Sequence, residues 1–515
     1  MLILHKKKPS ISPKAVESIP SMTRDQIQLE SKKNEGYDNP TLQTDVPPSV
    51  PTYREPVNSA PLQSKPKDAP SSVYVVSTPN EKSGDLEASV YDPYQNREVK
   101  HPTTYTDTLF HMLKASLGTG ILAMPNAFHN SGYVVGTVGT LLIGFLCTYS
   151  MHMLVKCHYE LCRRKKVPSL TYPGIAEAAF DEGPEKTRWL APIGQPLCNA
   201  FLIMYQIGTS CIYVVFIASN LKAVCDMYVG EHDVRVYMLY IFLPLVLICW
   251  VRNLKLLAPF STVANLATIL SFGITFYYVF TDVPSIRERH AVGEFRGMPL
   301  FFGTVLFAME AIGVIMPLEN EMAKPSKFSS LFGVLNMSMV PITLLYTLVG
   351  FFGYIKYGDK AEGSITLNLP HDEKLAQSVK LMLAMAIYCT YALSQYVAFD
   401  LLWNNIIEPK LEKTKMKIFY EYAVRTTIVI ITFVLAAAIP NLELFISLIG
   451  ALCLATMGIA LPAIIQLLTF WDSLHGLEKT IFILKNLTMI LIAIMAFLIG
   501  VTTSVSEILH KIFHV

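Results

Sequence analysis

The chain has 515 residues, of which 52% are hydrophobic and only 16% are charged, and its formal net charge is +2. Soluble domains carry about 25% charged residues, so this composition excludes a single soluble globule, and the small net charge excludes a nucleic-acid binder. The nine cysteines lie mostly inside apolar runs. They predict buried thiols rather than the disulfide framework of a secreted scaffold.

The start of the chain differs in composition from the remainder. Residues 1–100 hold 26 of the 82 charged side chains, and 14 of the 31 prolines precede Thr103. Such a segment cannot bury enough apolar surface to offset its ordering entropy, so residues 1–103 are predicted to be a disordered tail. The short apolar start Met1–Leu4 is followed by lysines, which is not the pattern of a secretory signal peptide. The tail is therefore expected to be cytosolic.

Apolar stretches of about 20 residues, the length that crosses a bilayer, follow one another after the tail. The eleven predicted spans are residues 106–129, 133–157, 192–223, 236–251, 258–281, 299–321, 329–355, 374–403, 424–440, 443–470 and 482–504. They divide the chain into a first repeat (104–281), a second repeat (282–470) and a last helix with a short tail (471–515). A short helix over Tyr172–Phe180 is expected between the second and third spans.

The loop charges orient these spans. With the N-terminus in the cytosol, the inner loops carry more than twice as many Lys and Arg residues as the outer loops and the C-terminal tail. The run Arg163–Lys166 and the lysines of 410–417 belong to the inner set. The positive-inside rule therefore predicts a cytosolic N-terminus and an extracellular or lumenal C-terminus.

The first span contains helix breakers. Gly118-Thr119-Gly120 lies near the predicted middle of the bilayer, and Pro125 follows five residues later. Glycine relaxes the backbone, and proline removes a donor and clashes with the preceding turn. Unpaired N–H and C=O groups are costly in lipid. The break is therefore predicted to line a cavity that takes a polar ligand.

The sixth span repeats this arrangement in Phe307–Asn320. Gly313 is followed by Pro317, and the carboxylate of Glu310 lies at mid-span. Interruptions at matching positions of two halves are typical of transporters that bind substrate at the repeat interface. The alternative is that Gly and Pro only kink two packed helices. Two breaks at the same offset favour the transporter interpretation.

The backbone at the breaks suggests the substrate class. A half-helix N-terminus offers N–H groups and a positive dipole end to a carboxylate, and unwound carbonyls accept from an ammonium group. A zwitterionic amino acid satisfies both. The predicted contacts are Gly118, Thr119 and Gly120 with the carboxylate, and Phe307, Ala308 and Met309 with the amine.

Three ordered motifs, His111–Pro125, Phe307–Asn320 and Gly363–Pro370, resemble the proton-coupled amino acid transporters, a branch of the amino acid/auxin permease superfamily. The resemblance runs over residues 105–505 and is greatest to insect members with a long N-terminal tail. It implies an all-α membrane protein of eleven helices, with a LeuT-like five-plus-five inverted repeat and broken helices 1 and 6. It also implies transport of small neutral amino acids and placement in the plasma membrane or the late endosome and lysosome. For some members it implies nutrient signalling to a growth-control kinase complex.

Two features depart from the family pattern. Ala115 and Ser116 stand where relatives have Gly and Asn ahead of the Gly-Thr-Gly break. Vertebrate relatives pair an outer-loop cysteine with one that follows the Asn-Leu-Pro motif. Cys225 matches the first, but His371-Asp372-Glu373 follows Pro370 and offers no partner. No such disulfide is expected here.

Ionisable residues within the spans are candidates for function. His111 matches the family histidine implicated in proton coupling and titrates near neutrality, although a structural hydrogen bond to a neighbouring helix is an equal alternative. Lys114 is expected to reach toward the inner surface. Glu310 is predicted to meet the substrate amine, stabilise the break or relay a proton. Glu319 is expected to face solvated loops near the inner end of its span.

Spans 3 and 8 close the site in LeuT-like proteins, and their polar residues at suitable depth are Tyr205, Gln206, Tyr391 and Gln395. The expected function is secondary active transport of small neutral amino acids by alternating access, with protons as the driving ion and without a cofactor or metal. The alternative is an amino acid sensor that uses the same pocket with little transport. A channel or a membrane enzyme is less favoured, because the sequence has no ring of pore charges and no metal or nucleophile motif.

Overall fold

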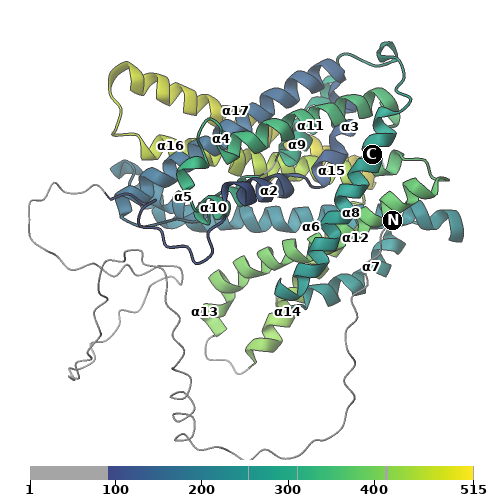
Figure 1. The fold of residues 1–515 in the computed structure, drawn as a ribbon, viewed down its shortest axis with the longest axis horizontal. Coiled ribbons are helices and arrows are strands. Elements are labelled where there is room, and N and C mark those ends of the chain that lie inside the picture. The colour runs from purple at the N-terminus through teal and green to yellow at the C-terminus, as the bar shows by residue number, and fades with distance from the viewer. Residues whose placement is uncertain (1–90, 253, 310, 412–415, 514–515) are drawn as a thin grey trace, which may run out of the picture. The chain divides into compact units, whose positions relative to one another are not determined.

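The computed structural model describes residues 91–515 apart from 253, 310, 412–415 and 514–515. The described residues form helices and no strand, and their one β-type contact is an isolated bridge between Thr103 and Met322 (Figure 1). The predicted disorder of residues 1–90 lies outside the described residues. Residues 91–103 lie against the ends of the helices, and the predicted domain boundaries stay predictions.

The long helices follow the predicted spans in chain order. They are α4 (Tyr133–Lys165), α6 (Ala191–Val229), α7 (Val234–Cys249), α8 (Leu254–Phe280), α11 (Val334–Tyr357), α12 (Lys374–Leu402), α14 (Lys417–Ala438) and α17 (Gly476–Phe513). The tenth predicted span is a continuous helical stretch of α15 (Leu442–Ile449), the π-helical η8 (Gly450–Ala460) and α16 (Leu461–Thr469).

Nine helical stretches in the described part of the chain are long and apolar enough to cross a bilayer. Val234–Cys249 is apolar but shorter, and the first predicted span is divided into two short helices. The prediction of an all-helical, multi-pass membrane protein is confirmed, whereas the count of eleven spans stays a prediction. The short helix expected between the second and third spans is also confirmed, as α5 (Tyr172–Asp181).

The first predicted span is broken where its glycines lie. It consists of α2 (Tyr105–Ser116) and α3 (Thr119–Ser131). Thr104 begins α2 with a capping box, in which its side chain accepts from the Asp107 N–H and the Asp107 carboxylate accepts from the Thr104 N–H. Gly118 then caps α3 in an extended conformation.

The sixth predicted span is broken in the same way. It consists of α9 (Met298–Ala308) and α10 (Ile312–Asn320), with Met309 at the end of the first helix and Ala311 before the second. Position 310 between them lies outside the described residues. Both predicted breaks are therefore present, although the symmetry of the two five-helix repeats stays a prediction.

Glycines allow α9 to pack closely against the tenth predicted span. A Cβ on Gly450 would lie 1.9 Å from the Gly303 carbonyl oxygen, and a Cβ on Gly303 would lie 2.4 Å from the Ser447 carbonyl oxygen. Because no side chain fits between the two backbones, this approach requires glycine. This close approach holds α9, which ends at the second break, against the tenth predicted span.

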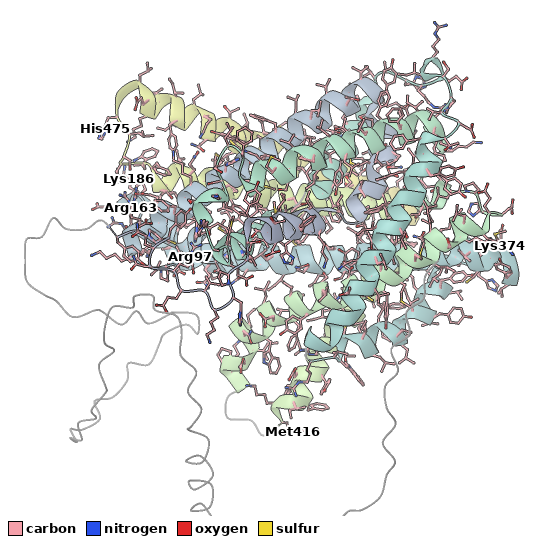
Figure 2. All side chains as sticks on the ribbon, viewed as in Figure 1. Arg97, Arg163, Lys186, Lys374, Met416 and His475 are labelled. Atoms are coloured by element: carbon pink, nitrogen blue, oxygen red, sulfur yellow. The ribbon has the colours of Figure 1, made fainter. Side chains whose placement is uncertain are left out.

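Two basic residues of the predicted inner loops, Arg163 and Lys186, lie toward the same side of the view in Figure 2, and Lys374, at the start of α12, lies toward the other. Arg97 lies toward the same side as Arg163. Arg97 also donates to the Pro168 carbonyl of a predicted inner loop, so the N-terminal segment (residues 91–103) meets the helices at the end that the sequence predicts to be cytosolic.

Candidate substrate site

The two breaks lie against each other. A Cβ on Gly120, in the first turn of α3, would lie 2.6 Å from the Cα of Ala308, the last residue of α9. A Cβ on Gly118 would meet no heavy atom within 4 Å, so open space lies beside the first break. The structure thus brings the predicted residues of the two breaks together, with Thr119, Phe307, Ala308 and Met309 all buried.

The backbone gives this region its polarity. The first N–H groups of α3 have no partner within the helix, and the last carbonyl groups of α9 have none either. The start of α3 is therefore electropositive and the end of α9 electronegative. Since Gly120 and Ala308 are in contact, the two opposite dipole ends are close together. Together they suit a small molecule that carries both an anionic and a cationic group.

A neighbouring helix stabilises the first break. The Tyr346 hydroxyl of α11 donates to the Ser116 carbonyl at the end of α2, and Tyr346 is fully buried. The Gly118 N–H donates to the same carbonyl over 3.1 Å. The Ser116 carbonyl is thus satisfied by protein groups, as a membrane interior requires. The sequence analysis did not identify Tyr346, which has no breaker or charge beside it to mark it.

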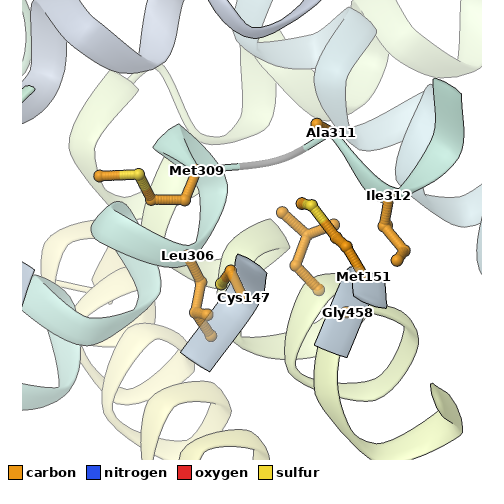
Figure 3. A pocket seen from close by; sticks show the side chains of 8 residues that line it. Cys147, Met151, Leu306, Met309, Ala311, Ile312 and Gly458 are labelled. Atoms are coloured by element: carbon orange, nitrogen blue, oxygen red, sulfur yellow. The ribbon is translucent and has the colours of Figure 1, made fainter. Parts of the chain in front are cut away.

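A small pocket lies beside the second break (Figure 3). Its lining comes from four elements: Cys147 and Met151 of α4, Leu306 and Met309 of α9 and its end, Ala311 and Ile312 at the start of α10, and Leu454 and Gly458 of η8. These side chains are apolar or small. Such a lining suits an apolar side chain of modest size next to polar backbone groups.

The polar residues predicted on spans 3 and 8 form contacts with neighbouring helices. Gln206 on α6 accepts from the Ser394 hydroxyl of α12 over 3.0 Å, and Tyr205 packs half-buried against the hydrophobic core. Tyr391 and Gln395 on α12 both contact the Thr432 hydroxyl of α14, at 2.8 Å and 3.4 Å. The described hydrogen bonds of Gln206, Tyr391 and Gln395 therefore run to α12 and α14. The predicted substrate roles of all four residues stay predictions.

The predicted proton-coupling residues are placed differently. His111 is exposed on α2, four residues after Asp107, while Met112 and Ser116 of the same helix are buried. Lys114 is exposed on α2 as well. Glu310 lies outside the described residues. Their roles in proton coupling stay predictions.

A buried charged cluster lies at the far ends of the half-helices, and no sequence motif marks it. The Glu319 Oε2 atom of α10 is 3.2 Å from Arg97 Nη1 and 3.3 Å from His158 Nδ1 of α4. The side chains of Glu319 and His158 are fully buried, and that of Arg97 is 5% exposed. The expectation that Glu319 faces solvated loops is wrong, because the N-terminal segment covers it. We call Arg97, His158 and Glu319 the buried triad.

Two tyrosines of the N-terminal segment lie beside the buried triad. The Tyr94 ring is 5.4 Å from the Arg97 guanidinium carbon and 4.8 Å from the Tyr159 ring centre. Burial, together with the negative charge of Glu319, raises the pKa of Tyr94 above its usual range. Burial also raises the pKa of Tyr91. Both phenols are therefore neutral at physiological pH.

An all-helical membrane protein with two apposed helix breaks belongs to the class of membrane transporters. The family model described as transmembrane amino acid transporter protein matches residues 101–506. The chain therefore belongs to this family of amino acid transporters.

Two curated relatives agree with this assignment. The proton-coupled amino acid transporter-like protein pathetic of Drosophila melanogaster is 41% identical over 425 residues, which cover 82% of this chain and 89% of the relative. The probable amino acid transporter skat-1 of Caenorhabditis elegans is 25% identical over 451 residues, which cover 84% and 95%. Both relatives are named as transporters and not as enzymes.

Comparison with solved structures finds distant similarities. Mhp1, a nucleobase-cation-symport-1 family transporter with bound bromovinylhydantoin, aligns with a TM-score of 0.46 and 13% identity over 82% of this chain and 94% of Mhp1. A manganese transporter of Eremococcus coleocola aligns with a TM-score of 0.41 and 10% identity over 82% and 99%. These similarities are distant, and the family assignment rests on the sequence relatives.

Proposed function

We propose that the chain is a secondary active transporter that carries small neutral amino acids by alternating access, with protons as the driving ion. The observation that carries this proposal is the contact between Gly120 and Ala308, which sets the start of α3 beside the end of α9. One end offers N–H groups to the α-carboxylate and the other offers carbonyls to the α-ammonium group. The small apolar pocket at Met309 and Ile312 then limits the size of the side chain.

Neutral substrates are favoured by what surrounds the breaks. The described residues that line the pocket carry no charge. A charged substrate side chain would lose its hydration there without a charged partner among the described lining residues, which costs several kcal/mol. Glycine, alanine and proline fit this description, whereas glutamate and lysine do not.

Proton coupling and topology complete the proposal. His111 and Glu310 are the proposed proton-coupling residues of the two broken spans. The excess of Lys and Arg in the predicted inner loops, which include Arg163 and Lys186, supports a cytosolic N-terminus by the positive-inside rule. The proposed location is the plasma membrane or the late endosome and lysosome, where a proton gradient is available.

The test is uptake by the purified, full-length protein in liposomes. Labelled glycine, alanine, proline, glutamate and lysine are compared with and without an inward proton gradient. We expect saturable uptake of the first three, increased by the gradient. Saturable binding without uptake would instead support the sensor, and uptake unaffected by the gradient would reject proton coupling.

A substitution at the first break tests, in the same uptake assay, whether the substrate binds there. Because a Cβ on Gly118 enters open space, the Gly118→Leu variant is expected to fold and to occupy that space. Uptake should then fall about a hundredfold, the cost of a misplaced substrate. The matched control is Gly273→Leu, since Gly273 is exposed on α8 and also has open space at its Cβ. Equal uptake by the two variants would reject the site.

A further inference from the structure

The buried triad ties three separate elements together at the ends of the two inner half-helices. Arg97 donates from Nε to the Pro168 carbonyl over 3.1 Å and from Nη1 to the Glu319 carbonyl over 3.0 Å. Asn320 donates to the Leu170 carbonyl over 3.0 Å. The N-terminal segment, the loop after α4 and the end of α10 are thus joined through one buried site.

The backbone continues this connection to α2. The Thr103 N–H donates to the Glu321 carbonyl over 2.8 Å, and the Ala323 N–H donates to the Thr103 carbonyl over 2.9 Å. Because α2 begins at Tyr105, the N-terminal segment links the end of α10 to the start of α2. These two half-helices also contact each other directly, and Figure 1 shows them side by side. Neither can move away from α4 without breaking contacts of the N-terminal segment.

The hydrogen bonds assign the proton on His158. Its Nε2 atom accepts from the Leu170 N–H over 3.1 Å, so Nε2 carries no proton in this arrangement. The ring is therefore neutral, with its proton on Nδ1, which faces Glu319 Oε2 at 3.3 Å. The buried triad then holds one positive guanidinium, one negative carboxylate and a neutral imidazole.

This charge balance does not allow an additional proton. A proton on Glu319 would leave Arg97 as an unpaired buried charge, and a proton on His158 Nε2 would break its bond with Leu170. Among the described residues, the other titratable groups beside the triad are the phenols of Tyr91, Tyr94 and Tyr159 and the buried thiol of Cys162 on α4. None of them supplies a negative charge. An unpaired charge in a buried site is strongly unfavourable.

We propose that Glu319 and His158 form a second proton-binding site, which is closed by Arg97 and opens when one proton binds. The open arrangement binds one proton more than the closed one. Binding of a proton therefore shifts the equilibrium toward the open arrangement, in which the N-terminal segment, α2 and α10 are released from α4. This proposal rests on the proposed proton-coupled transport. We call the cytosolic end of the substrate path, between α2, α10 and α4, the exit. A proton carried across with the substrate then opens the exit, and loss of this proton to the cytosol lets the exit close again.

The experiment compares two modes of transport in liposomes with labelled alanine. Accumulation driven by an inward proton gradient requires the exit to open and close with the proton. Counterflow exchange at equal pH on both sides requires only that the substrate crosses. The Glu319→Gln variant neither binds the proton nor pairs with Arg97. We expect its gradient-driven accumulation to fall about tenfold while counterflow stays within about twofold of wild type.

Two further variants and one control complete the test. Arg97→Gln opens the site from the N-terminal segment and should show the same split between the two modes. The double variant should lose no more accumulation than either single variant, since each removes the same interaction. The control is Glu321→Gln, because Glu321 is exposed two residues further along the chain and should behave as wild type.

The outcomes separate this inference from the proposed function. If wild type accumulates alanine with the gradient and both single variants do so within about twofold, the second proton site is rejected alone. Loss of counterflow together with accumulation in both variants would show a purely structural role and also reject it. If wild type does not respond to the gradient, proton coupling itself is rejected, and the second proton site with it.

Discussion

The two helix breaks and the buried triad are both polar regions inside an apolar protein, but their polarity has different sources. At the breaks it comes from backbone groups at the ends of α3 and α9, surrounded by apolar side chains. In the buried triad it comes from charged side chains of elements that are far apart in sequence, with Arg97 and Glu319 separated by 222 residues. The breaks suit binding of a dipolar ligand, whereas the triad suits a change of state.

The two helix breaks and the buried triad also differ in how freely their parts can move. The breaks are held by close backbone contacts at Gly120 and by the Tyr346 hydroxyl bond, which leave little freedom. The triad depends on Arg97, which belongs to a segment before the first helix and is held by side-chain contacts. A binding site between rigid backbones and a release point on a short segment are separate requirements of alternating access. We expect substitutions in the two regions to have distinct effects.

The largest expected effect is that of Gly120→Ala in the contact between the breaks. The added Cβ would lie 2.6 Å from the Ala308 backbone, which no rotamer change relieves. Overpacking of this kind costs about 3 kcal/mol, and we expect both gradient-driven uptake and counterflow to fall to background. Denaturant titration in detergent measures the free energy of unfolding, and the liposome assay measures both transport modes.

The control for this variant is Gly273→Ala on α8. It adds the same methyl group where nothing lies within 4 Å, and so it should retain stability and transport. If Gly120→Ala lost accumulation but kept counterflow, it would resemble the triad variants. The proposed distinction between the two regions would then be incorrect.

The sequence predicts the breaks well because their signals are local. Gly118 lies at the first break, where it caps α3. The second break lies just before Gly313 and Pro317, which are inside α10, so the pair indicates the region of the break and not its exact position. The span edges follow from apolar length in the same way. The sequence does not predict the triad, because nothing near Arg97 distinguishes it from other charges of a Pro-rich tail. Its role depends on Glu319 and His158, which only the tertiary fold brings near.

Helix rotation is a second property that the sequence leaves open. The sequence indicates the depth of the polar residues on α6 and α12 but not their direction, and in the structure Gln206 bonds to Ser394 and Tyr391 bonds to Thr432. Both helices are apolar around most of their circumference, so the amphipathic pattern that would orient them is weak. Depth in the bilayer can be counted along a span, whereas the direction of a side chain depends on the neighbouring helices.

A smaller effect is expected from Tyr346→Phe, which affects the same break without adding volume. The variant removes the hydroxyl that donates to the buried Ser116 carbonyl. Loss of one donor to a buried acceptor costs about 2 kcal/mol, and the same denaturant titration measures it. We expect both transport modes to fall in parallel, because the break itself is loosened. Tyr277→Phe on an exposed face of α8 serves as the control, and a loss of stability there of equal size would contradict the explanation.

The smallest expected effect is that of Thr104→Ala, which lies between the two regions. Thr104 caps α2 through its hydrogen bonds with Asp107, and the preceding residue, Thr103, bonds to the end of α10. Loss of an N-cap costs about 1 kcal/mol, whereas Thr104→Ser keeps the capping oxygen and should match wild type. Since the variant frays the junction without touching Gly118 or Gly120, we expect it to reduce accumulation more than counterflow. A parallel loss of both would show that α2 acts with the breaks and not with the buried triad.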